Sequence, residues 1–290
     1  MKYKLTEETK EFLGRKLHRI VCVTAFASVS VGDIGGWVES ESNLSQEGNA
    51  WVYGDALVCG NAKVYGNAKV FGNAEVYGNA KVCDNAEVFG DAKVCDNAKV
   101  FGDAKVYGNA KVCGNAEVYG NAEVFGNTEV YGNAKVCDNA KVCYNAKVCD
   151  NAWVFGNAEV FGNAKVFGNA EVYGNAEVCD NAKVCYNAKV CDNAWVFGNA
   201  WVFGNAEVFG DAKVYGNADF IVLKNSWSSG RYFTYTASNK MWKVGCFYGS
   251  GKKLIEKAYE DSELSGKCYE ATVKYVEEIE RLKKELKNEH

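Results

Sequence analysis

A strict six-residue period is the feature that most constrains the fold of this chain. From Asn49 to Ala218 the sequence repeats as Asn-Ala-x-Val-(Tyr/Phe/Cys)-Gly. Valine occupies all 28 positions of its slot from Val52 to Val214, and alanine fills 28 of the 29 positions two residues earlier, where Thr128 is the exception. A repeat of this regularity indicates a stack of identical structural units rather than an ordinary globular domain.

The side chains of each repeat divide into an inner and an outer set. In an extended segment the Ala and Val side chains face one way, while x and the following Tyr, Phe or Cys face the other. The x slot holds 14 Lys and 9 Glu among its 29 members, so the outer set lies in water and Ala and Val form the interior. Gly-Asn then forms the corner between short strands, because Gly has no side chain and Asn tolerates left-handed backbone angles.

This pattern resembles that of the hexapeptide-repeat family, in which an aliphatic residue points inward and a small residue precedes it by two places. The fold of that family is the left-handed parallel β-helix, a prism with three hexads in each coil. Residues 49–218 match the pattern, which implies about nine coils and a rod about 45 Å long at a strand spacing of about 4.8 Å. We therefore predict an all-β solenoid with a small β-rich N-terminal cap over residues 1–48, the β-helix over 49–218, and a C-terminal α+β domain over 219–290.

Three hexads per coil would stack side chains that are 18 residues apart. Opposite charges on neighbouring strands attract one another, and one face would carry a ladder of alternating sign: Lys69, Glu87, Lys105, Glu123, Lys141 and Glu159. The other two faces alternate less well, so the charges support the coil length only in part.

The cysteines of the repeat have a packing explanation. The slot after Val holds Tyr or Phe 18 times, always followed by Gly, and Cys 10 times, followed by Asp six times, Gly twice and Tyr twice. Cys therefore fits as a smaller alternative to an aromatic ring. Cys137, Cys143 and Cys149 fall on three different faces, so we expect no metal site, which needs convergent ligands. Cys95 and Cys113 are the one repeat pair stacked on adjacent coils, and a thiol-based site is the alternative.

Histidine is too scarce for the usual chemistry of the family. Many hexapeptide-repeat proteins are acyltransferases, and that resemblance implies a His general base, typically at a trimer interface; metal-dependent members bind zinc through His. This chain has only His18 and His290, both outside the repeats, and no insertion loop between Asn49 and Ala218. We expect no catalytic residue, metal or cofactor, and an acyltransferase-like enzyme with a pocket between protomers is the alternative. The segment "GSGKK" at 249–253 indicates a strand-to-helix turn rather than a phosphate loop.

Composition and the N-terminus indicate a cytoplasmic protein. The net charge of −4 gives no overall attraction to nucleic acid or to an anionic membrane. Residues 1–20 are charged throughout and lack the apolar segment of a signal peptide, and the apolar stretch 21–31 is too short to span a bilayer as a helix. In that compartment we expect reduced thiols, and 13 Cys is in any case an odd number.

The N-terminal segment supplies a second resemblance. We expect strands around Tyr3–Leu5 and Leu17–Val23, followed by a turn at Gly32-Asp33. Residues 32–56, with Gly-Gly-Trp-Val at 35–38 and Leu-Ser-Gln-Glu-Gly at 44–48, look like the start of YdcK-like hexapeptide-repeat proteins of bacteria and prophages. The resemblance implies an intracellular β-helix and no established activity.

The C-terminal segment carries the two candidate sites. Residues 219–227, 230–238 and 241–249 read as three strands, and two helices follow. Aromatic and basic side chains on these strands form a candidate binding surface: Trp227, Arg231, Tyr232, Tyr235, Lys240, Trp242 and Lys243. The alternative is a small cap with a filled core.

The last helix carries apolar residues at alternating spacings of four and three, typical of a short heptad seam: Cys268, Thr272, Tyr275, Ile279, Leu282 and Leu286. We expect Tyr275, Ile279, Leu282 and Leu286 to mediate self-association; the alternative is that this face packs on the preceding sheet.

The functional hypothesis is a non-enzymatic binding or scaffold protein in which a rigid rod spaces two end domains. The expected partner is protein, including a second or third copy of the chain, with no membrane partner and with nucleic acid disfavoured. The prophage resemblance implies a host-interaction role. Outward Tyr, Phe and Cys ladders, with Trp51, Trp153, Trp195 and Trp201 in the x slot, leave a filament-forming protein as a further alternative.

Overall fold

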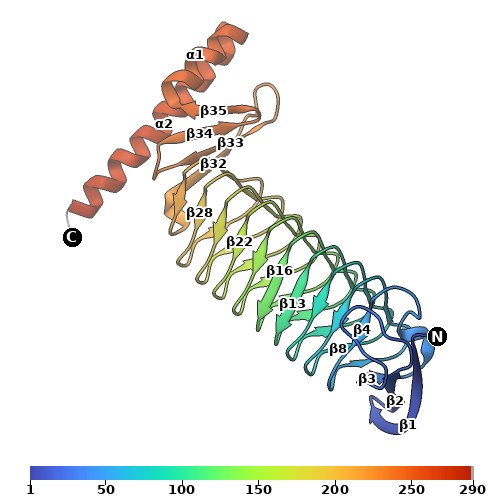
Figure 1. Ribbon diagram of the computed structural model, residues 1–290. Helices are drawn as coiled ribbons and strands as arrows, with labels where there is room; N and C mark the ends of the chain where they lie inside the picture. Colours follow the sequence, from blue (N-terminus) through green and yellow to red (C-terminus); the bar gives the residue numbers. More distant parts are fainter. Residues whose placement is uncertain (289–290) are drawn as a thin grey trace.

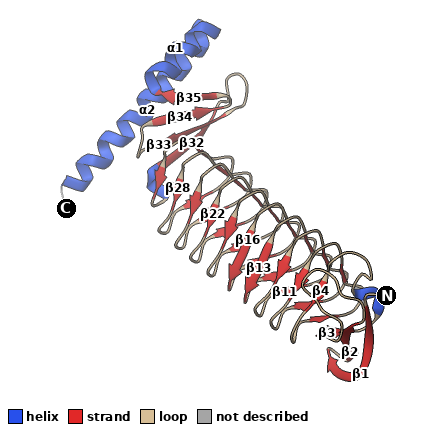
Figure 2. Cartoon of the chain, viewed as in Figure 1, coloured by secondary structure: helices blue, strands red, loops and turns tan. Residues whose placement is uncertain are grey.

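The structure, a computed structural model, describes residues 1–288. The chain forms a straight rod with a β cap at its N-terminal end and a sheet with two helices at its C-terminal end (Figure 1). Figure 2 shows that short strands and turns alternate along the whole rod, and that the long helices are confined to one end.

The rod is a parallel β-solenoid with three hexads in each coil. Strands β4 (Trp51–Val52) to β31 (Lys213–Val214) each comprise residue x and the following Val of one hexad; only β13 (Lys105–Gly108) and β16 (Glu123–Gly126) are longer. Val88 of β10 (Glu87–Val88) pairs in parallel with Val70 and with Val106, 18 residues away in either direction. The three faces are sheets of 12, 10 and 9 strands, so the predicted β-helix and its coil length are confirmed.

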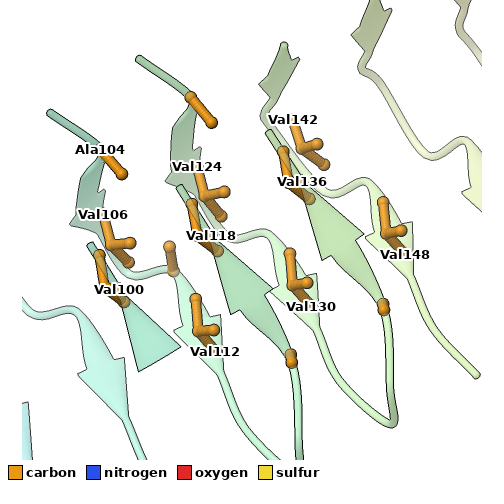
Figure 3. Close-up of a cluster of buried hydrophobic side chains, with 14 of the residues drawn as sticks. Val100, Ala104, Val106, Val112, Val118, Val124, Val130, Val136, Val142 and Val148 are labelled. Atoms are coloured by element: carbon orange, nitrogen blue, oxygen red, sulfur yellow. The ribbon is translucent and has the colours of Figure 1, made fainter. Parts of the chain in front are cut away.

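Alanine and valine fill the interior of the coils. Every Val from Val52 to Val214 is at most 1% exposed, and Figure 3 shows Val106, Val124 and Val142 at the same place in successive coils. Burying one such side chain contributes about 1.5–3 kcal/mol. Thr128 is buried in an Ala slot, where its hydroxyl donates a hydrogen bond to the carbonyl of Phe125 at 2.6 Å.

The corners require glycine or a residue that tolerates positive φ. At Gly72 φ is +71°, and an added Cβ would lie 3.0 Å from the backbone nitrogen of Gly90 one coil later. Asp84 adopts the same conformation, with φ +60°, and its carboxylate accepts a hydrogen bond from the N–H of Gly102 at 3.1 Å. Each Asp or Tyr corner is followed by Gly at the same corner of the next coil, which leaves room for the extra side chain.

Ladders of side chains reinforce the outer surface. The Asn residues of the corners donate along the rod from one amide to the next, as Asn67 does to Asn85 at 2.9 Å. Charges pair between coils as well: Lys69 with Glu87 at 3.1 Å, on the face with the alternating charges, and Lys93 with Glu75 at 2.8 Å on another face. Exposed pairs contribute only a few tenths of a kcal/mol each, so the interior dominates stability.

The N-terminal cap is a β-hairpin that continues into the first coil. β1 (Tyr3–Phe12) and β2 (Arg15–Cys22) are antiparallel, and β3 (Ile34–Val38) follows the predicted turn. β3 pairs with β2 on one side and, in parallel, with β5 (Leu57–Val58) on the other. The short 3-10 helix η1 (Glu41–Asn43) follows. The solenoid sheet thus extends into the segment before Asn49.

The C-terminal domain is a four-stranded antiparallel sheet followed by two helices. The prediction of a single strand over 241–249 was wrong, because Gly245 adopts φ +56° and turns the chain there. Ser250 caps the first helix by accepting a hydrogen bond from the N–H of Lys253, so "GSGKK" is a strand-to-helix turn. The elements are the turn η2 (Asn217–Asp219), β32 (Phe220–Lys224), β33 (Tyr232–Thr236), β34 (Met241–Val244), β35 (Phe247–Ser250), α1 (Gly251–Asp261) and α2 (Glu263–Asn288).

No helix within residues 1–288 is both long enough and apolar enough to cross a membrane. Helix α2 is long, but charged residues occur throughout it.

Residue x and the corner residues of each coil direct their N–H groups toward the C-terminal end of the rod. The N–H of x donates to a carbonyl of the next coil, as Lys63 does to Ala80 at 2.9 Å, so the carbonyls that accept these bonds are left without a coil partner at the N-terminal end. Lys2 donates from Nζ to the carbonyl of Ala50 at 2.8 Å, and the Asn43 amide donates to the carbonyls of two coil residues at 2.9 Å. Side-chain donors therefore close this end.

The C-terminal end presents unpaired N–H groups and is closed by side-chain acceptors. The hydroxyl of Thr234 accepts from the N–H of Glu207 at 2.9 Å, and that of Ser238 accepts from Lys213 at 2.7 Å. Such caps prevent the open edges from pairing with other chains.

Candidate functional site

Two residues of the predicted binding surface are buried in the core of the C-terminal domain. Tyr235 is 7% exposed and Trp242 is 2% exposed, and they pack in a cluster with Phe233, Leu254 and Val273. They lie on β33 and β34, the two central strands of the sheet, on the face that the helices cover. Their assignment to a recognition surface was therefore wrong.

The other five residues of that set do not form one surface. Trp227 packs against Tyr269, with ring centroids 6.0 Å apart. Lys243 donates to the carbonyl of Gly245 at 2.7 Å, and its Nζ lies 4.5 Å from the ring of Phe209, so it joins the sheet to the rod. The three that remain are exposed at separate places: Arg231, Tyr232 and Lys240.

Helix α2 has two apolar faces, and only one of them is covered. Val273 and Val276 are buried against the sheet. The seam residues Tyr275, Leu282 and Leu286 are 55%, 42% and 60% exposed, and the other three seam residues, Cys268, Thr272 and Ile279, are half-buried. The predicted heptad is thus not the face that packs on the sheet, which was the alternative interpretation.

An apolar cavity lies at the start of the seam. Its volume is about 420 Å³. Leu223 of β32 and Trp227 of the loop that follows line it on one side, and Cys268, Thr272 and Tyr275 line it from α2. The seam and the cavity together form one continuous apolar strip on the outside of the C-terminal domain. We call this strip, over Leu223, Trp227 and the six seam residues of α2, the α2 seam surface.

Charged residues flank the seam, and one of them attaches α2 to the rod. Glu278 forms a salt bridge with Arg281, whose guanidinium keeps the pKa of that carboxyl below its ordinary value. Lys283 donates from Nζ to Glu280 and to the carbonyl of Ala218, both at 2.8 Å. The second contact attaches the middle of α2 to the end of the rod.

Cys95 and Cys113 are joined by a disulfide, which corrects the expectation that all thiols are free. The pair lies on one face in adjacent coils, with Cα atoms 4.7 Å apart, because the two residues are 18 apart in sequence. With Asp96 they also form a group of donor atoms within 4.8 Å of one another, but their sulfurs are bonded to each other.

The other cysteines of the repeat pack singly in the solenoid and do not converge on one site. Cys137, Cys143 and Cys149 follow strands that belong to three different sheets. The indole N–H of Trp153 donates to the sulfur of Cys137 at 3.1 Å. Burial raises the pKa of Cys143 to about 11, so this thiol is not an activated nucleophile at neutral pH.

The outward aromatic residues largely cover one another. Phe71, Phe89, Tyr107 and Phe125 stack in successive coils with ring centroids 4.7–4.9 Å apart. Of the four Trp residues in the x slot, Trp51 is buried beneath the N-terminal cap, and the rest are 39–41% exposed. Tyr186, which occupies a corner, is 61% exposed.

His18 lies on β2 in the N-terminal cap. Its Nδ1 is 3.0 Å from the carbonyl of Thr6 on the neighbouring strand, which accounts for its position structurally. His290 lies outside the described residues.

Comparison with known proteins supports the fold and finds similarity over part of the chain. No protein-family model matches the chain. A segment of 60 residues is 40% identical to the uncharacterised acetyltransferase YdcK of Escherichia coli (strain K12) and covers 18% of each protein. The chain thus matches less than a fifth of the length of this curated relative. The similarity leaves enzymatic activity open.

The repeat, the parallel coils with 18-residue pairing and the matched segment agree with one another. The chain folds as a parallel β-solenoid of six-residue repeats, and a part of it is similar to YdcK.

Proposed function

We propose that this protein is a non-enzymatic cytoplasmic scaffold that self-associates through the α2 seam surface. The rod then holds the N-terminal cap at a fixed distance from a C-terminal assembly domain. The observation that carries the proposal is the exposed heptad seam of α2, on a helix whose other apolar face is already buried.

Exposed apolar residues at heptad spacing favour a partner helix. Each Leu or Tyr side chain that leaves water contributes about 1.5–3 kcal/mol before the cost of association. The seam positions Tyr275, Ile279, Leu282 and Leu286 are uncharged, and the charges of α2 lie beside them. Three heptads would be short for an isolated coiled coil, but here the sheet already holds the helix in place.

The flanking charges favour a second copy in parallel orientation. In heptad terms Tyr275 and Leu282 occupy d, and Ile279 and Leu286 occupy a, so Glu278 is at g and Lys283 at the following e. Residues g and e′ of parallel helices face each other across the seam, which places Glu278 opposite Lys283 of the second chain. In an antiparallel pair, g residues face g residues instead. Glu278 would then lie near the g residues of the second chain, which include the like-charged Glu285.

We propose protein rather than nucleic acid or membrane as the further partner. The net charge is −4, and Lys and Glu alternate or mix on the outer faces of the rod, so no extended basic surface is available for phosphates. A host-interaction role, which the prophage resemblance implies, would use the same scaffold.

The test is the mass of the full chain in solution, by light scattering after size exclusion, for matched variants. We expect a discrete dimer or trimer for the unchanged chain and a monomer for Leu282→Glu, which puts a charge into the seam. The control Lys284→Glu changes charge on the outer face of the same helix and should leave the mass unchanged. A monomeric unchanged chain, or a Leu282→Glu variant of unaltered mass, would sink the proposal.

The paired charges give a second arm of the same experiment. Glu278→Lys should weaken association because it places like charges across the seam, and adding Lys283→Glu should restore it. If both variants and their combination associate equally well, the helices do not pair in parallel.

An acyltransferase-like enzyme is the second candidate, because the matched relative carries an acetyltransferase name. The test is turnover of acetyl-CoA by the full chain against small amines, with His18→Ala as the variant and Lys16→Ala, on the same strand, as the control. Under the scaffold proposal the thiol product forms no faster than without protein. Turnover that His18→Ala abolishes and Lys16→Ala preserves would establish the enzyme instead.

A further inference from the structure

At the corner around Gly204, the last coil leaves two backbone donors without an acceptor among the described residues. In the preceding coil, the N–H of Cys185 donates to a carbonyl of the last coil at 3.0 Å, and that of Asn187 does so at 2.9 Å. The equivalent groups of the last coil are the N–H of Phe203 and of Asn205. Neither donates to any group within residues 1–288. Because the equivalent N–H groups of Cys185 and Asn187 donate toward the C-terminal end, both N–H groups point out of the end of the rod.

Neighbouring donors of the same coil are satisfied by the chain itself. The N–H of Trp201 donates to the side chain of Asn217 at 2.8 Å, and those of Glu207 and Lys213 donate to hydroxyls of the C-terminal sheet. Phe203 and Asn205 lie between two of these capped positions. The cap therefore has an opening above this corner.

A cavity of about 550 Å³ occupies the opening. Phe203, Gly204 and Asn205 line it from the rod, and Phe220, Val222 and Tyr232 line it from the C-terminal sheet. Asn217 also lines it, so its walls are largely aromatic and aliphatic with two asparagines, and none of its lining residues is charged. Figure 1 shows this position where β32 follows the last coil.

One of the asparagine ladders, the one that contains Asn187 and Asn205, ends in the same cavity. Asn187 donates to the side-chain oxygen of Asn205 at 3.2 Å. The amide N–H₂ of Asn205 itself has no acceptor among the described residues, since no further coil follows. The cavity thus combines apolar walls with a third donor beside the two backbone N–H groups.

The spacing of the two backbone donors identifies the kind of ligand. In the preceding coil, the corresponding pair of N–H groups binds the carbonyls of Val202 and Gly204, two residues apart in one chain. Residues two apart in an extended segment are separated by about 6–7 Å, so one carboxylate cannot serve both donors. A ligand that satisfies both must carry carbonyl groups at the spacing of a polypeptide.

We propose that this cavity, between the last coil and β32, binds an extended peptide segment of a partner protein. The carbonyls of two residues at i and i+2 accept from Phe203 and Asn205, and an apolar side chain of the peptide lies among Phe203, Phe220 and Tyr232. The peptide adds one strand to the open edge of the face that ends with β29 (Trp201–Val202), as in other cases of strand addition. Uncharged walls favour a peptide with apolar or aromatic residues.

This inference goes beyond self-association, because the site lies within one chain. A monomeric Leu282→Glu variant retains it, so failure of either proposal leaves the other testable.

The experiment uses a peptide that copies a coil of this chain. The probe is fluorescein-labelled Asn-Ala-Glu-Val-Phe-Gly-Asn-Ala, the sequence of residues 157–164, with blocked ends, and binding to the full chain is followed by fluorescence anisotropy. In parallel, hydrogen exchange of the Phe203 and Asn205 amides is compared with and without the peptide. We expect saturable binding and slower exchange at these two amides.

Gly204→Asp is the variant that tests the location. Gly204 has φ +70°, and an added Cβ would meet no atom within 4 Å. Asp is accommodated at equivalent corners such as Asp84. The new side chain would occupy the cavity, and we expect the peptide to bind at least tenfold more weakly. Gly54→Asp is the control: φ is +58°, and no atom lies closer than 3.8 Å, at the opposite end of the rod.

Two results would overturn the proposal. One is the absence of an anisotropy change with the unchanged chain at millimolar peptide. The other is binding that Gly204→Asp leaves intact while exchange at Phe203 and Asn205 stays fast, since the peptide would then lie elsewhere.

Discussion

Asn43→Asp tests whether side-chain donors are needed to close the carbonyls at the N-terminal end of the rod. Asn43 is fully buried at the N-terminal end. Its amide N–H₂ donates to the carbonyls of Gly60 and Ala62, each at 2.9 Å, and its oxygen accepts from the N–H of Ser40 at 2.8 Å. Aspartate has the same shape and keeps the acceptor, but it loses both donors.

The expected cost follows from the two carbonyls that lose their partner. A buried acceptor without a hydrogen bond costs about 1–3 kcal/mol, so two of them cost about 2–6 kcal/mol. The new carboxylate oxygen also faces two carbonyl oxygens. Because a solenoid opens locally from its ends, the loss should appear first in the N-terminal cap and the first coil.

The assay is native-state hydrogen exchange, which reports the free energy of opening residue by residue. We expect amides of β3 and of the first coil to exchange faster in Asn43→Asp by the factor that about 2–6 kcal/mol implies, while amides near Val160 are unchanged. Asn61→Asp is the matched control: its amide donates to Asn79 in the exposed ladder, and this chain already carries Asp at the equivalent position 55. Equal effects of the two variants would refute the reasoning.

Three further predictions concern the rod. Val124→Ala removes two buried methyl groups and should lower the free energy of unfolding by about 2 kcal/mol in urea titration. Gly126→Ala should destabilise by about 1–3 kcal/mol, because φ is +77° and an added Cβ would meet the next coil at 2.9 Å; Gly54→Ala, where that space is open, should cost less in the same titration. Burial raises the pKa of Cys143 to about 11, and of other repeat thiols in the same direction, so the folded chain holds protons that the unfolded chain loses above about pH 9. The free energy of unfolding should therefore fall between pH 9 and 11, which a urea titration would show as a lower midpoint at pH 10 than at pH 8. Burial lowers the pKa of Lys2 to about 8. Lys2 therefore acts in the opposite direction, but it is a single group.

The interior of the rod was predictable because its period is carried by residue type. Val at every sixth position and Ala two places before it define both the inner face and the strand. The 18-residue pairing of Lys69 with Glu87 followed from the same count and is observed. The Asn ladders were not predictable in the same way, because the preference of Asn for turns already accounts for Asn at most corners.

The caps and the C-terminal domain were less predictable because no repeat constrains them. A strand with mixed aromatic and basic residues, such as Tyr235 and Lys240, has the same sequence pattern whether helices cover one face of its sheet or leave it in water. The prediction that Tyr235 and Trp242 lie on the surface was wrong for this reason, since helices cover them. The split of 241–249 depended on the left-handed turn at Gly245. The signal for the caps is the need to pair the end coils. It calls for side-chain donors such as Lys2 at the N-terminal end and acceptors such as Thr234 at the C-terminal end.

The seam of α2 was predictable as a pattern, and its exposure was not. Spacings of four and three identify Tyr275, Ile279, Leu282 and Leu286. Only the structure shows that Val273 and Val276 supply the face that packs on the sheet, which leaves the heptad face uncovered.

Small-angle X-ray scattering of the full chain at several concentrations tests the scaffold most directly. Helix α2 crosses the direction of the rod (Figure 1), so chains joined through parallel α2 helices direct their rods away from one another. We predict a mass of two or three times the 31.7 kDa of one chain and a maximum dimension larger than that of a single rod. A mass of one chain at every concentration would contradict the account.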